Sequence, residues 1–412
     1  LVTSHSSPIT RHQSLVTNHS SPITRHQSLV TNHSSPITRH QSHITTPSKK
    51  HKTNIMEIKR LQKIISLFFI LFITGQSVLA QDIHFSQNYA TPLYVNPALT
   101  GLYNGDFRVT AAYRSQWNAV SNGAPYRTMT ASFDGKIVSG ATTQSDWLSG
   151  GLMIYTDKAG FIGFTTNTVD LSLAYNKALN NQDFISFGVM GGLSLKSIDL
   201  SGGEFGTQFD GINYDAMISS GEDINDERYA HANVSTGVVY YHIRDARDYF
   251  FVGGGAYNIL KSEKTFLGNN FNNGASVPLR LSLQAGGSIK LNHILDIVPS
   301  IYFMNQAKSM KTDVGIMGRY VLQHNDHSNV FRAFSIGPLL RVTQHFEKAI
   351  GLDALIVAAK VDYDDLSIGL SYDLNISELN NATSGKGGSE VSVVYTPKVR
   401  SKRASPVSCP RF

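Results

Sequence analysis

The chain has 412 residues, with 36 Lys and Arg, 30 Asp and Glu, and one cysteine. The single Cys409 excludes an internal disulfide framework and a zinc site built from cysteines. The formal net charge is +6, but residues 1–80 contribute +8 and residues 81–412 contribute −2. Because the basic residues are concentrated in the first segment, we expect no nucleic-acid partner. Charged residues make up only 16% of the chain, which is unusual for a soluble protein and typical of a membrane β-barrel.

The chain begins with a repeat. Residues 1–42 are three near-identical copies of a 14-residue unit, LVTSHSSPITRHQS followed twice by LVTNHSSPITRHQS. The unit is polar, contains proline and has no apolar face to bury, so we expect residues 1–55 to be disordered. The copies contain six histidines, but we expect no metal site there. The near-identity of the copies indicates recent duplication, and Met56 is the expected initiator, with the upstream sequence assigned to the protein from too early a start.

Residues 56–80 have the features of a secretory signal peptide. A basic stretch at 57–63 precedes an apolar core at 64–73, and small residues lead to Ala80. The apolar core is too short to span a bilayer as a helix. We therefore expect export and cleavage between Ala80 and Gln81, with an N-terminal membrane anchor as the alternative.

After the predicted cleavage site, no apolar run approaches the roughly 18 residues of a spanning helix, so the mature chain is either soluble or a β-barrel. Apolar and polar residues alternate with a period of two, most clearly over 277–292, where Val277, Leu279, Leu281 and Leu283 alternate with polar or small residues. This alternation predicts about fourteen strands, at 107–117, 125–136, 147–157, 164–178, 184–199, 229–244, 249–260, 277–292, 296–306, 311–323, 330–345, 348–361, 364–374 and 390–397.

An even number of alternating segments of about ten residues, with aromatic residues near their ends, is typical of an antiparallel transmembrane β-barrel, here over 107–397. The three longest predicted connections, 200–228, 261–276 and 375–389, all follow odd-numbered strands. They would lie outside the cell if the chain enters the barrel from the periplasm. The alternative is a soluble secreted β-sandwich, which shows the same alternation.

Motifs for catalysis are absent: the sequence has no Walker A motif, no Gly-x-Ser-x-Gly elbow and no His-Glu-x-x-His. Three polar clusters have residue types that metal, calcium or paired-carboxylate sites use, but polar turns or solvated loops explain them better. These clusters are His324, Asp326 and His327; residues 222–227; and Asp362, Asp364 and Asp365. We expect no catalytic residues, no metal and no cofactor, and therefore no enzyme.

Two segments flank the predicted barrel, 81–106 before it and 398–412 after it, and both are expected on the periplasmic side. The second segment is a basic tail that can contact peptidoglycan, anionic lipid or an acidic partner, or remain solvated. Its basic residues are Lys398, Arg400, Lys402, Arg403 and Arg411.

The first flanking segment carries a family resemblance. QDIHFSQNY at 81–89 runs into PLYVNPALTG at 92–101, YRSQW follows at 113–117, and the chain ends in CPRF. These motifs resemble the PorP/SprF family of the Bacteroidetes type IX secretion system over 81–412. The resemblance implies a non-enzymatic outer-membrane β-barrel, related in architecture to hydrophobic-solute channels, that takes part in protein secretion and gliding motility. The implied partners are outer-membrane lipid and either periplasmic secretion components or a secreted cargo adhesin.

The motif residues are the candidate site, either as a plug in the lumen or as a docking surface for a periplasmic partner. They are Phe85, Ser86, Gln87, Tyr89, Asn96, Pro97 and Gly101. Asn96 and Pro97 favour a turn, and Gly101 can supply a positive φ. Three functions stay open: a secretion component, a channel for hydrophobic solutes, and a soluble secreted β-protein.

Overall fold

The computed structural model describes residues 83–397, except 119–124, 140–145, 161, 201–202, 216, 222–226, 246, 263–265, 267–276, 326–329, 345–349 and 379. Three predicted regions lie outside the described residues: the repeat at 1–55, the signal peptide at 56–80 with its Ala80–Gln81 cleavage site, and the basic tail. The tail residues concerned are Lys398, Arg400, Lys402, Arg403 and Arg411. No helix within the described part of the chain is long and apolar enough to cross a membrane.

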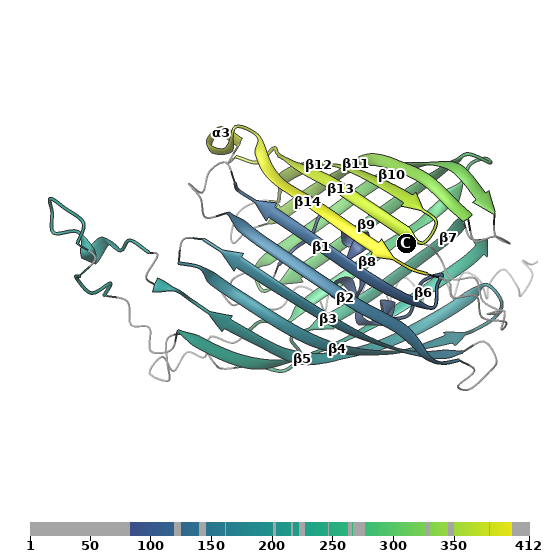
Figure 1. Ribbon diagram of the computed structural model, residues 1–412, viewed down its shortest axis with the longest axis horizontal. Helices are drawn as coiled ribbons and strands as arrows, with labels where there is room; N and C mark the ends of the chain where they lie inside the picture. The colour runs from purple at the N-terminus through teal and green to yellow at the C-terminus, as the bar shows by residue number, and fades with distance from the viewer. Residues whose placement is uncertain are drawn as a thin grey trace, which may run out of the picture. The chain divides into compact units, whose positions relative to one another are not determined.

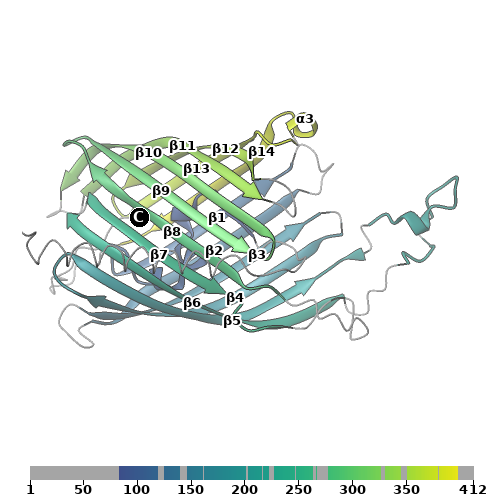
Figure 2. The ribbon, with the colours of Figure 1, turned by 180° about the vertical axis from the view of Figure 1, so that it is seen from behind.

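The described residues form a closed antiparallel β-barrel in which each strand pairs with its neighbour in sequence and β1 pairs with β14 (Figure 1, Figure 2). The predicted fold class is therefore confirmed. The strands are β1 (Phe107–Gln116), β2 (Tyr126–Ser139), β3 (Trp147–Ala159), β4 (Phe164–Ala178), β5 (Asp183–Ser197), β6 (Arg228–Asp245), β7 (Asp248–Tyr257), β8 (Arg280–Lys290), β9 (Leu295–Gln306), β10 (Ser309–Asn325), β11 (Val330–Gln344), β12 (Gly351–Tyr363), β13 (Leu366–Asn375) and β14 (Lys386–Tyr395).

Each strand overlaps one predicted from alternation, and the differences lie at the ends. β8 begins at Arg280, just after Pro278, which has no N–H to give to a ladder. β14 begins at Lys386, earlier than predicted, and Gly388 already pairs with Gln116 of β1. The glycines at this end carry no side chain, so the first residues of β14 show no alternation in the sequence.

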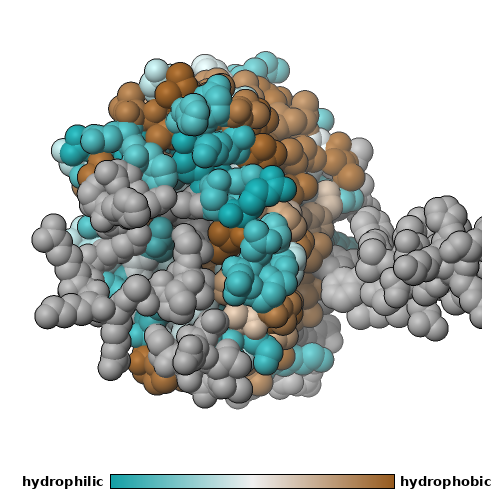
Figure 3. Space-filling model, turned by 90° about the vertical axis from the view of Figure 1, so that its right-hand side faces the viewer, coloured by the Kyte–Doolittle hydropathy of each residue, from teal (hydrophilic) through white to brown (hydrophobic). Residues whose placement is uncertain are grey.

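The two faces of the wall differ sharply in chemistry. On β8, Leu283 is 40% exposed and Ile289 is 50% exposed, whereas Arg280 is 3% and Ser282 is 1% exposed. Apolar side chains thus face outward and polar ones face the lumen, the reverse of a water-soluble protein. Figure 3, a view onto one end of the barrel, shows hydrophobic residues along the flank and hydrophilic residues at the end. A closed barrel with an apolar exterior is a membrane protein, so the alternative of a soluble β-sandwich was wrong.

The connections at the two ends of the barrel differ in length. We call the end where β1 begins and β14 ends the turn end, and the opposite end the loop end. The three longest connections, 198–227, 258–279 and 376–385, all lie at the loop end. They contain the short helices η4 (Gly206–Gln208) and α3 (Asn380–Thr383). The predicted asymmetry between long and short connections is confirmed.

Residues 83–106, which we call the lumen segment, lie inside the barrel, where both views show them between the walls (Figure 1, Figure 2). They form three short helices: η1 (Asn88–Ala90), α2 (Pro92–Val95) and η2 (Pro97–Leu99). The core of the molecule forms between this segment and the wall, where Leu99 and Leu102 join a cluster with Trp147, Phe184 and Tyr241. Of the two positions that the sequence allowed, the lumen and a periplasmic surface, the structure has the lumen.

Candidate functional site

The local sequence explains how the lumen segment turns within so narrow a space. Pro92 and Pro97 stand at the first positions of α2 and η2, where a missing N–H costs nothing. The Asn96 side chain caps η2 by accepting a 2.8 Å hydrogen bond from the backbone N–H of Ala98. Gly101 then adopts a φ of 71°, the positive value expected for this glycine. The segment is thereby folded into compact turns with its side chains directed at the wall.

Ser86 lies at the centre of a buried polar cluster. Its backbone N–H donates to Glu390 Oε2 at 2.7 Å, and its hydroxyl donates to Asp373 Oδ1 at 2.8 Å. The same hydroxyl oxygen accepts from Arg114 Nη1 at 2.5 Å and from Arg341 Nη2 at 2.6 Å. These four partners come from β14, β13, β1 and β11 and are at most 3% exposed. One serine of the lumen segment is therefore held from four strands.

The fully buried charges around Ser86 form one balanced network of three cations and three carboxylates, and the part-exposed Asp353 adds a longer contact of 3.8 Å to Arg341. Its members are Arg114, Arg341, Lys311, Asp313, Asp373 and Glu390. Asp373 bridges the two guanidinium groups, at 2.6 Å from Arg114 and 2.7 Å from Arg341. Buried ions of opposite sign stabilise one another, but removing one partner of such a pair typically costs about 3–5 kcal/mol. The wall therefore binds this part of the lumen segment strongly and specifically.

Both polar atoms of the Gln87 side chain, and its backbone N–H, form hydrogen bonds. The N–H donates to Glu390 Oε1 at 2.9 Å, and Nε2 donates to the backbone oxygen of the same residue at 3.0 Å. The side-chain oxygen accepts from Tyr89 and Ser392, at 2.9 and 2.7 Å. A Cβ atom at Gly369 would come within 2.1 Å of this oxygen, so the close approach depends on glycine in β13.

Aromatic and cationic groups hold Phe85. Its ring meets Tyr94 edge-on at 5.6 Å between centroids, a favourable geometry for aromatic pairs. The guanidinium group of Arg280 lies 4.4 Å from the Tyr94 ring centroid and 3.9 Å from that of Tyr257. Lys311 Nζ donates to the backbone oxygen of Phe85 at 3.0 Å. Arg280 thus makes cation–π contacts with the rings of both Tyr94 and Tyr257.

Asn96 and Pro97 press directly against the backbone of the wall. Asn96 Nδ2 donates to the backbone oxygen of Gly254 at 3.0 Å. A Cβ atom at Gly188 would lie 2.3 Å from the carbonyl carbon of Pro97, and one at Gly237 would lie 1.9 Å from Asn96 Oδ1. Two glycines on adjacent strands, β5 and β6, therefore form the seat for this turn.

Gly101 marks the return of the segment to the turn end. Its N–H donates to Asp134 Oδ2 at 2.7 Å, and the Arg108 guanidinium group pairs with the same carboxylate at 2.8 Å. Arg108 Nη2 also donates to the backbone oxygen of Leu99 at 2.9 Å, and the Tyr103 hydroxyl donates to the backbone oxygen of Asp134 at 2.7 Å. This second buried cluster fixes the segment where it enters β1.

Two titratable groups of the lumen segment have shifted pKa values. Burial is the main reason that the pKa of His84 lies well below 6.5, and the cationic Lys311, Arg114 and Arg341 lower it further. Burial, reinforced by nearby carboxylates, raises the pKa of the Tyr89 hydroxyl. At neutral pH the imidazole is therefore neutral and the phenol is protonated.

The structure divides the candidate residues into two groups. The first group, Phe85, Ser86, Gln87 and Tyr89, contacts the wall formed by β1 and by β10 to β14. The second group, Asn96, Pro97 and Gly101, contacts β2, β3 and β5 to β7. Sequence reasoning missed the wall residues that receive them, chiefly Arg114, Arg341, Asp373 and Glu390. A signal was present, because each is a charged residue at an inward position of a predicted strand. Arg114 also belongs to the YRSQW motif.

The other polar clusters contribute no site in the described part of the chain. His324 belongs to β10, where its ring meets Phe331 edge-on at 5.7 Å, while Asp326 and His327 lie outside the described residues. Residues 222–226 also lie outside them. Asp362 is a β12 residue that pairs with Lys360, and residues 364–365 form the turn to β13. Among the described residues, no group of three or more His, Cys, Asp or Glu is placed to hold a metal ion.

Comparison with known families gives a decisive match. Residues 77–395 match the family described as "Type IX secretion system membrane protein PorP/SprF". The chain belongs to the PorP/SprF family. The matched region includes the whole lumen segment and all fourteen strands seen in the described residues, so the resemblance carried by the opening motif is confirmed. No curated protein matches the sequence.

Several solved structures are similar to this PorP/SprF protein at low identity. The CymD monoaromatic hydrocarbon channel is 10% identical, with a TM-score of 0.42 over 76% of this chain and 94% of that one. A Pseudomonas aeruginosa FadL homologue is 11% identical, with a TM-score of 0.42 over 74% and 94%. The Ralstonia pickettii toluene transporter TbuX is 11% identical, with a TM-score of 0.41 over 74% and 92%. Likenesses this weak say nothing about what the PorP/SprF chain binds.

Proposed function

We propose that this PorP/SprF protein is a non-enzymatic outer-membrane component of the type IX secretion and gliding machinery that supports secretion or surface attachment of cargo proteins. Family membership supports the link to secretion. The observation that carries the proposed scaffold role is the lumen segment, which is fixed to the wall by two buried ionic clusters. A barrel whose interior is filled and cross-linked in this way is suited to hold partners in position.

The filled lumen weighs against the rival function, a channel for hydrophobic solutes. Ser86, Gln87 and Asn96 are at most 1% exposed, and their contacts reach β6, β7 and the region from β11 through β14 to β1. A solute crossing the barrel would have to separate buried ion pairs, each costing about 3–5 kcal/mol to break. The scaffold role requires no such passage.

In this proposal the turn end faces the periplasm and the loop end faces outward, in keeping with the long external connections of such barrels. Periplasmic secretion components would bind at the turn end, and a cargo adhesin at the loop end. The connection between β5 and β6 extends beyond the rim in Figure 1 and carries the exposed side chains of Ile212 and Met217, at 83% and 93%. The apolar flank would contact outer-membrane lipid.

The test is deletion of the gene in a strain without paralogues, followed by assays of surface adhesins and of gliding. If the protein belongs to the core machinery, all type IX cargo should fail to reach the surface. If it serves one cargo, one adhesin should be lost while the others remain. Normal display of every cargo together with normal motility would refute a secretion role.

Complementation with single variants locates the cargo contact. Ile212→Asp changes only an exposed side chain at the loop end, so the barrel should assemble normally while cargo display falls. Leu179→Asp is the matched control because Leu179 is 53% exposed at the turn end. Equal cargo display by the two variants would argue against docking at the β5–β6 connection.

A further inference from the structure

Three cations lie in one row across the outer face of the barrel, near the loop end. The strand register pairs Arg127 of β2 with Lys158 of β3 and continues through β4 and β5 to Arg228 of β6. We call these five paired positions the cationic row. They carry basic or hydroxyl side chains and no acid, and they are Arg127, Lys158, Thr165, Ser197 and Arg228.

The cationic row faces away from the lumen. Thr128 and Asp157, the neighbours of Arg127 and Lys158, point inward, where the Thr128 hydroxyl donates to the Asp157 carboxylate at 2.6 Å. Successive side chains of a strand point to opposite faces. Arg127 and Lys158 therefore point outward, and both are exposed, as is Arg228.

The height of the row along the barrel matches the level of lipid headgroups. Thr165 of the row and the outward-facing Tyr175 are ten positions apart on β4. With a rise of about 3.4 Å per residue and a strand tilt of about 40°, they are separated by about 26 Å along the bilayer normal. The apolar band of outer-membrane barrels is about 25 Å tall. Between the two lie Val169, Leu171 and Leu173, which are 51%, 66% and 51% exposed.

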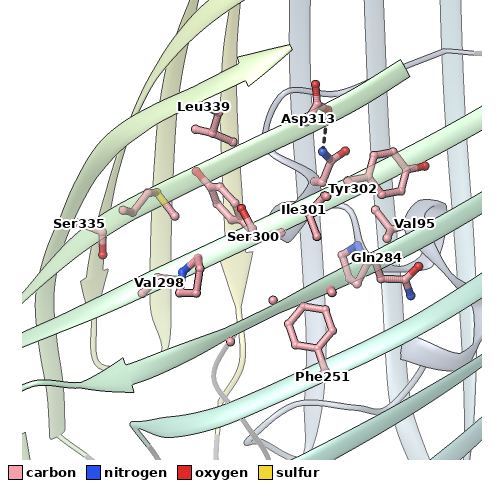
Figure 4. A pocket seen from close by; sticks show the side chains of 18 of the residues that line it. Val95, Phe251, Gln284, Val298, Ser300, Ile301, Tyr302, Asp313, Ser335 and Leu339 are labelled. Carbon is pink, nitrogen blue, oxygen red and sulfur yellow. Dashed lines mark hydrogen bonds between the residues drawn. The ribbon is translucent and has the colours of Figure 1, made fainter. Parts of the chain in front are cut away.

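The protein supplies no counter-charge to the row. Arg127 and Lys158 stand directly opposite each other, and like charges in this position destabilise a sheet. Among the described residues, the side chains of Arg127, Lys158 and Arg228 form no ion pair and no hydrogen bond. Charges on the inner face differ: Asp313, drawn in Figure 4, accepts from Asn88 at 3.0 Å. The outward cations are thus open to an anion from outside the chain.

An apolar groove of about 520 Å³ lies next to the row, on its hydrocarbon side. It begins at Met129 and Thr156, the next outward positions after Arg127 and Lys158, and includes the paired Ala111 and Ala131. The inward-facing residues that also line it each lie between two outward-facing lining residues, so the groove follows the outer surface. These residues are Ala112, Thr130, Tyr155 and Thr168.

A second groove, of about 490 Å³, lies beside the first on β12 to β14 and β1. Tyr113 and Val391, which pair in register, line both grooves and form the ridge between them. The second groove also includes Ser371 and Glu390, which point inward and each lie between outward-facing lining residues. The outer face therefore offers two parallel places for hydrocarbon chains.

We propose that the cationic row and the two grooves bind a phosphorylated glycolipid of the lipid A class. A phosphate accepts hydrogen bonds from Arg127 and Lys158, since guanidinium groups bind phosphate with two parallel bonds, and acyl chains lie in the grooves. The row spans four strand spacings of about 4.8 Å, or about 19 Å. A phosphorylated disaccharide covers more of this width than a single phosphate. The choice of glycolipid rests on the proposed outward position of the loop end.

Native mass spectrometry of the full protein purified in detergent tests the lipid class. The probes are diphosphorylated lipid A, the same lipid without phosphates, and phosphatidylglycerol. We expect lipid A to bind and removal of its phosphates to weaken binding at least tenfold. Equal binding of the dephosphorylated lipid would overturn the phosphate site. Equal or tighter binding of phosphatidylglycerol would overturn the choice of glycolipid.

The double variant Arg127→Gln, Lys158→Gln tests the row. One cation near an anionic lipid surface typically contributes about fivefold in affinity. Lipid A should therefore bind about 25-fold more weakly, equivalent to about 2 kcal/mol. Lys177→Gln is the matched control, since Lys177 is an exposed cation on the outer face of β4 at the turn end. Heat-dependent electrophoretic mobility checks that both proteins fold. Equal affinities of the two folded proteins would overturn the role of the row.

Ala131→Trp tests the first groove by filling it from the outer face. Binding of lipid A should weaken about tenfold, as expected when about two CH₂ groups lose contact with the wall. Ala232→Trp is the matched control, because Ala232 lies in the same register row on β6 and lines neither groove. Unchanged binding in folded Ala131→Trp would overturn the groove assignment. These measurements use no cargo, so their failure is distinct from failure of the secretion role in the deletion strain.

Discussion

The backbone N–H of Ser86 donates a 2.7 Å hydrogen bond to the carboxylate of Glu390, which lies 304 positions further along the chain. Glu390 belongs to β14, and Arg114 of the adjacent β1 donates to the Ser86 hydroxyl at 2.5 Å. The lumen segment is thus fixed to both strands whose pairing closes the barrel.

Glu390→Ala should release the first part of the lumen segment. The change removes acceptors from two backbone N–H groups and leaves Arg114 with one carboxylate fewer, at an expected cost of about 3–5 kcal/mol. Hydrogen–deuterium exchange of residues 83–106 measures the loss of protection. Asp248→Ala is the control, since its partner Arg244 is 71% exposed and such a surface pair contributes about 0–1 kcal/mol. Unchanged protection in Glu390→Ala would contradict the anchoring role.

Gly188→Ala should displace the turn at Pro97, because the added methyl group would overlap backbone atoms at 2.3 Å. Overpacking of this kind typically costs about 1–3 kcal/mol. Gly191→Ala on the same strand is the matched control, with its nearest neighbour at an ordinary 3.6 Å. Thermal unfolding followed by circular dichroism compares the two variants. Equal melting temperatures would show that the close contact between Gly188 and Pro97 does not depend on glycine.

Acidification should loosen the lumen segment through His84. Its pKa is lower in the folded protein than the ordinary 6.5, so the unfolded segment binds the proton more readily. The stability contributed by the neutral imidazole is therefore fully present above pH 6.5 and is lost as the pH falls below that value. Exchange protection of residues 83–106 should decrease from pH 7 to pH 5 and change less in His84→Gln. A pH response that is identical in both proteins would exclude His84 as its cause.

Leu171→Arg tests which face of the wall meets lipid. Leu171 is 66% exposed on β4, and a cation on the lipid face near the bilayer midplane costs about 2–4 kcal/mol. We expect a marked loss of folded barrel in liposomes, measured by electrophoretic mobility. Leu179→Arg, in the connection after β4, should assemble normally. Equal assembly of the two variants would show that Leu171 lies outside the hydrocarbon.

The sequence predicted the wall far better than the interior. Alternation such as that of 277–292 has one physical cause, the opposite chemistry of the two faces, and it can be detected strand by strand. The contacts of Arg114 could not be read in this way, because its ion-pair partner Asp373 lies 259 positions away and is placed by barrel closure. Gly188 likewise looks like any strand glycine until Pro97 is known to press against it.

The lumen segment was the least predictable element because it has no periodic pattern. Its apolar residues Phe85 and Leu93 would suit a barrel interior or a partner surface equally well. What decides between the two is the wall, whose buried carboxylates and guanidinium groups are satisfied by the segment itself. Two predictions depended only on neighbouring residues in the sequence and were confirmed. They are the turn at Asn96–Pro97 and the positive φ of Gly101.

The attachment of Ser86 to both β1 and β14 has a consequence for how the barrel is assembled. The first and last strands meet only after the whole chain has been made, and their meeting brings Arg114 beside Glu390. The pairing of β1 with β14 and the anchoring of the lumen segment at Ser86 are therefore one cooperative event. A nascent barrel that still lacks β14 also lacks the acceptors that Glu390 provides for the backbone N–H groups of Ser86 and Gln87.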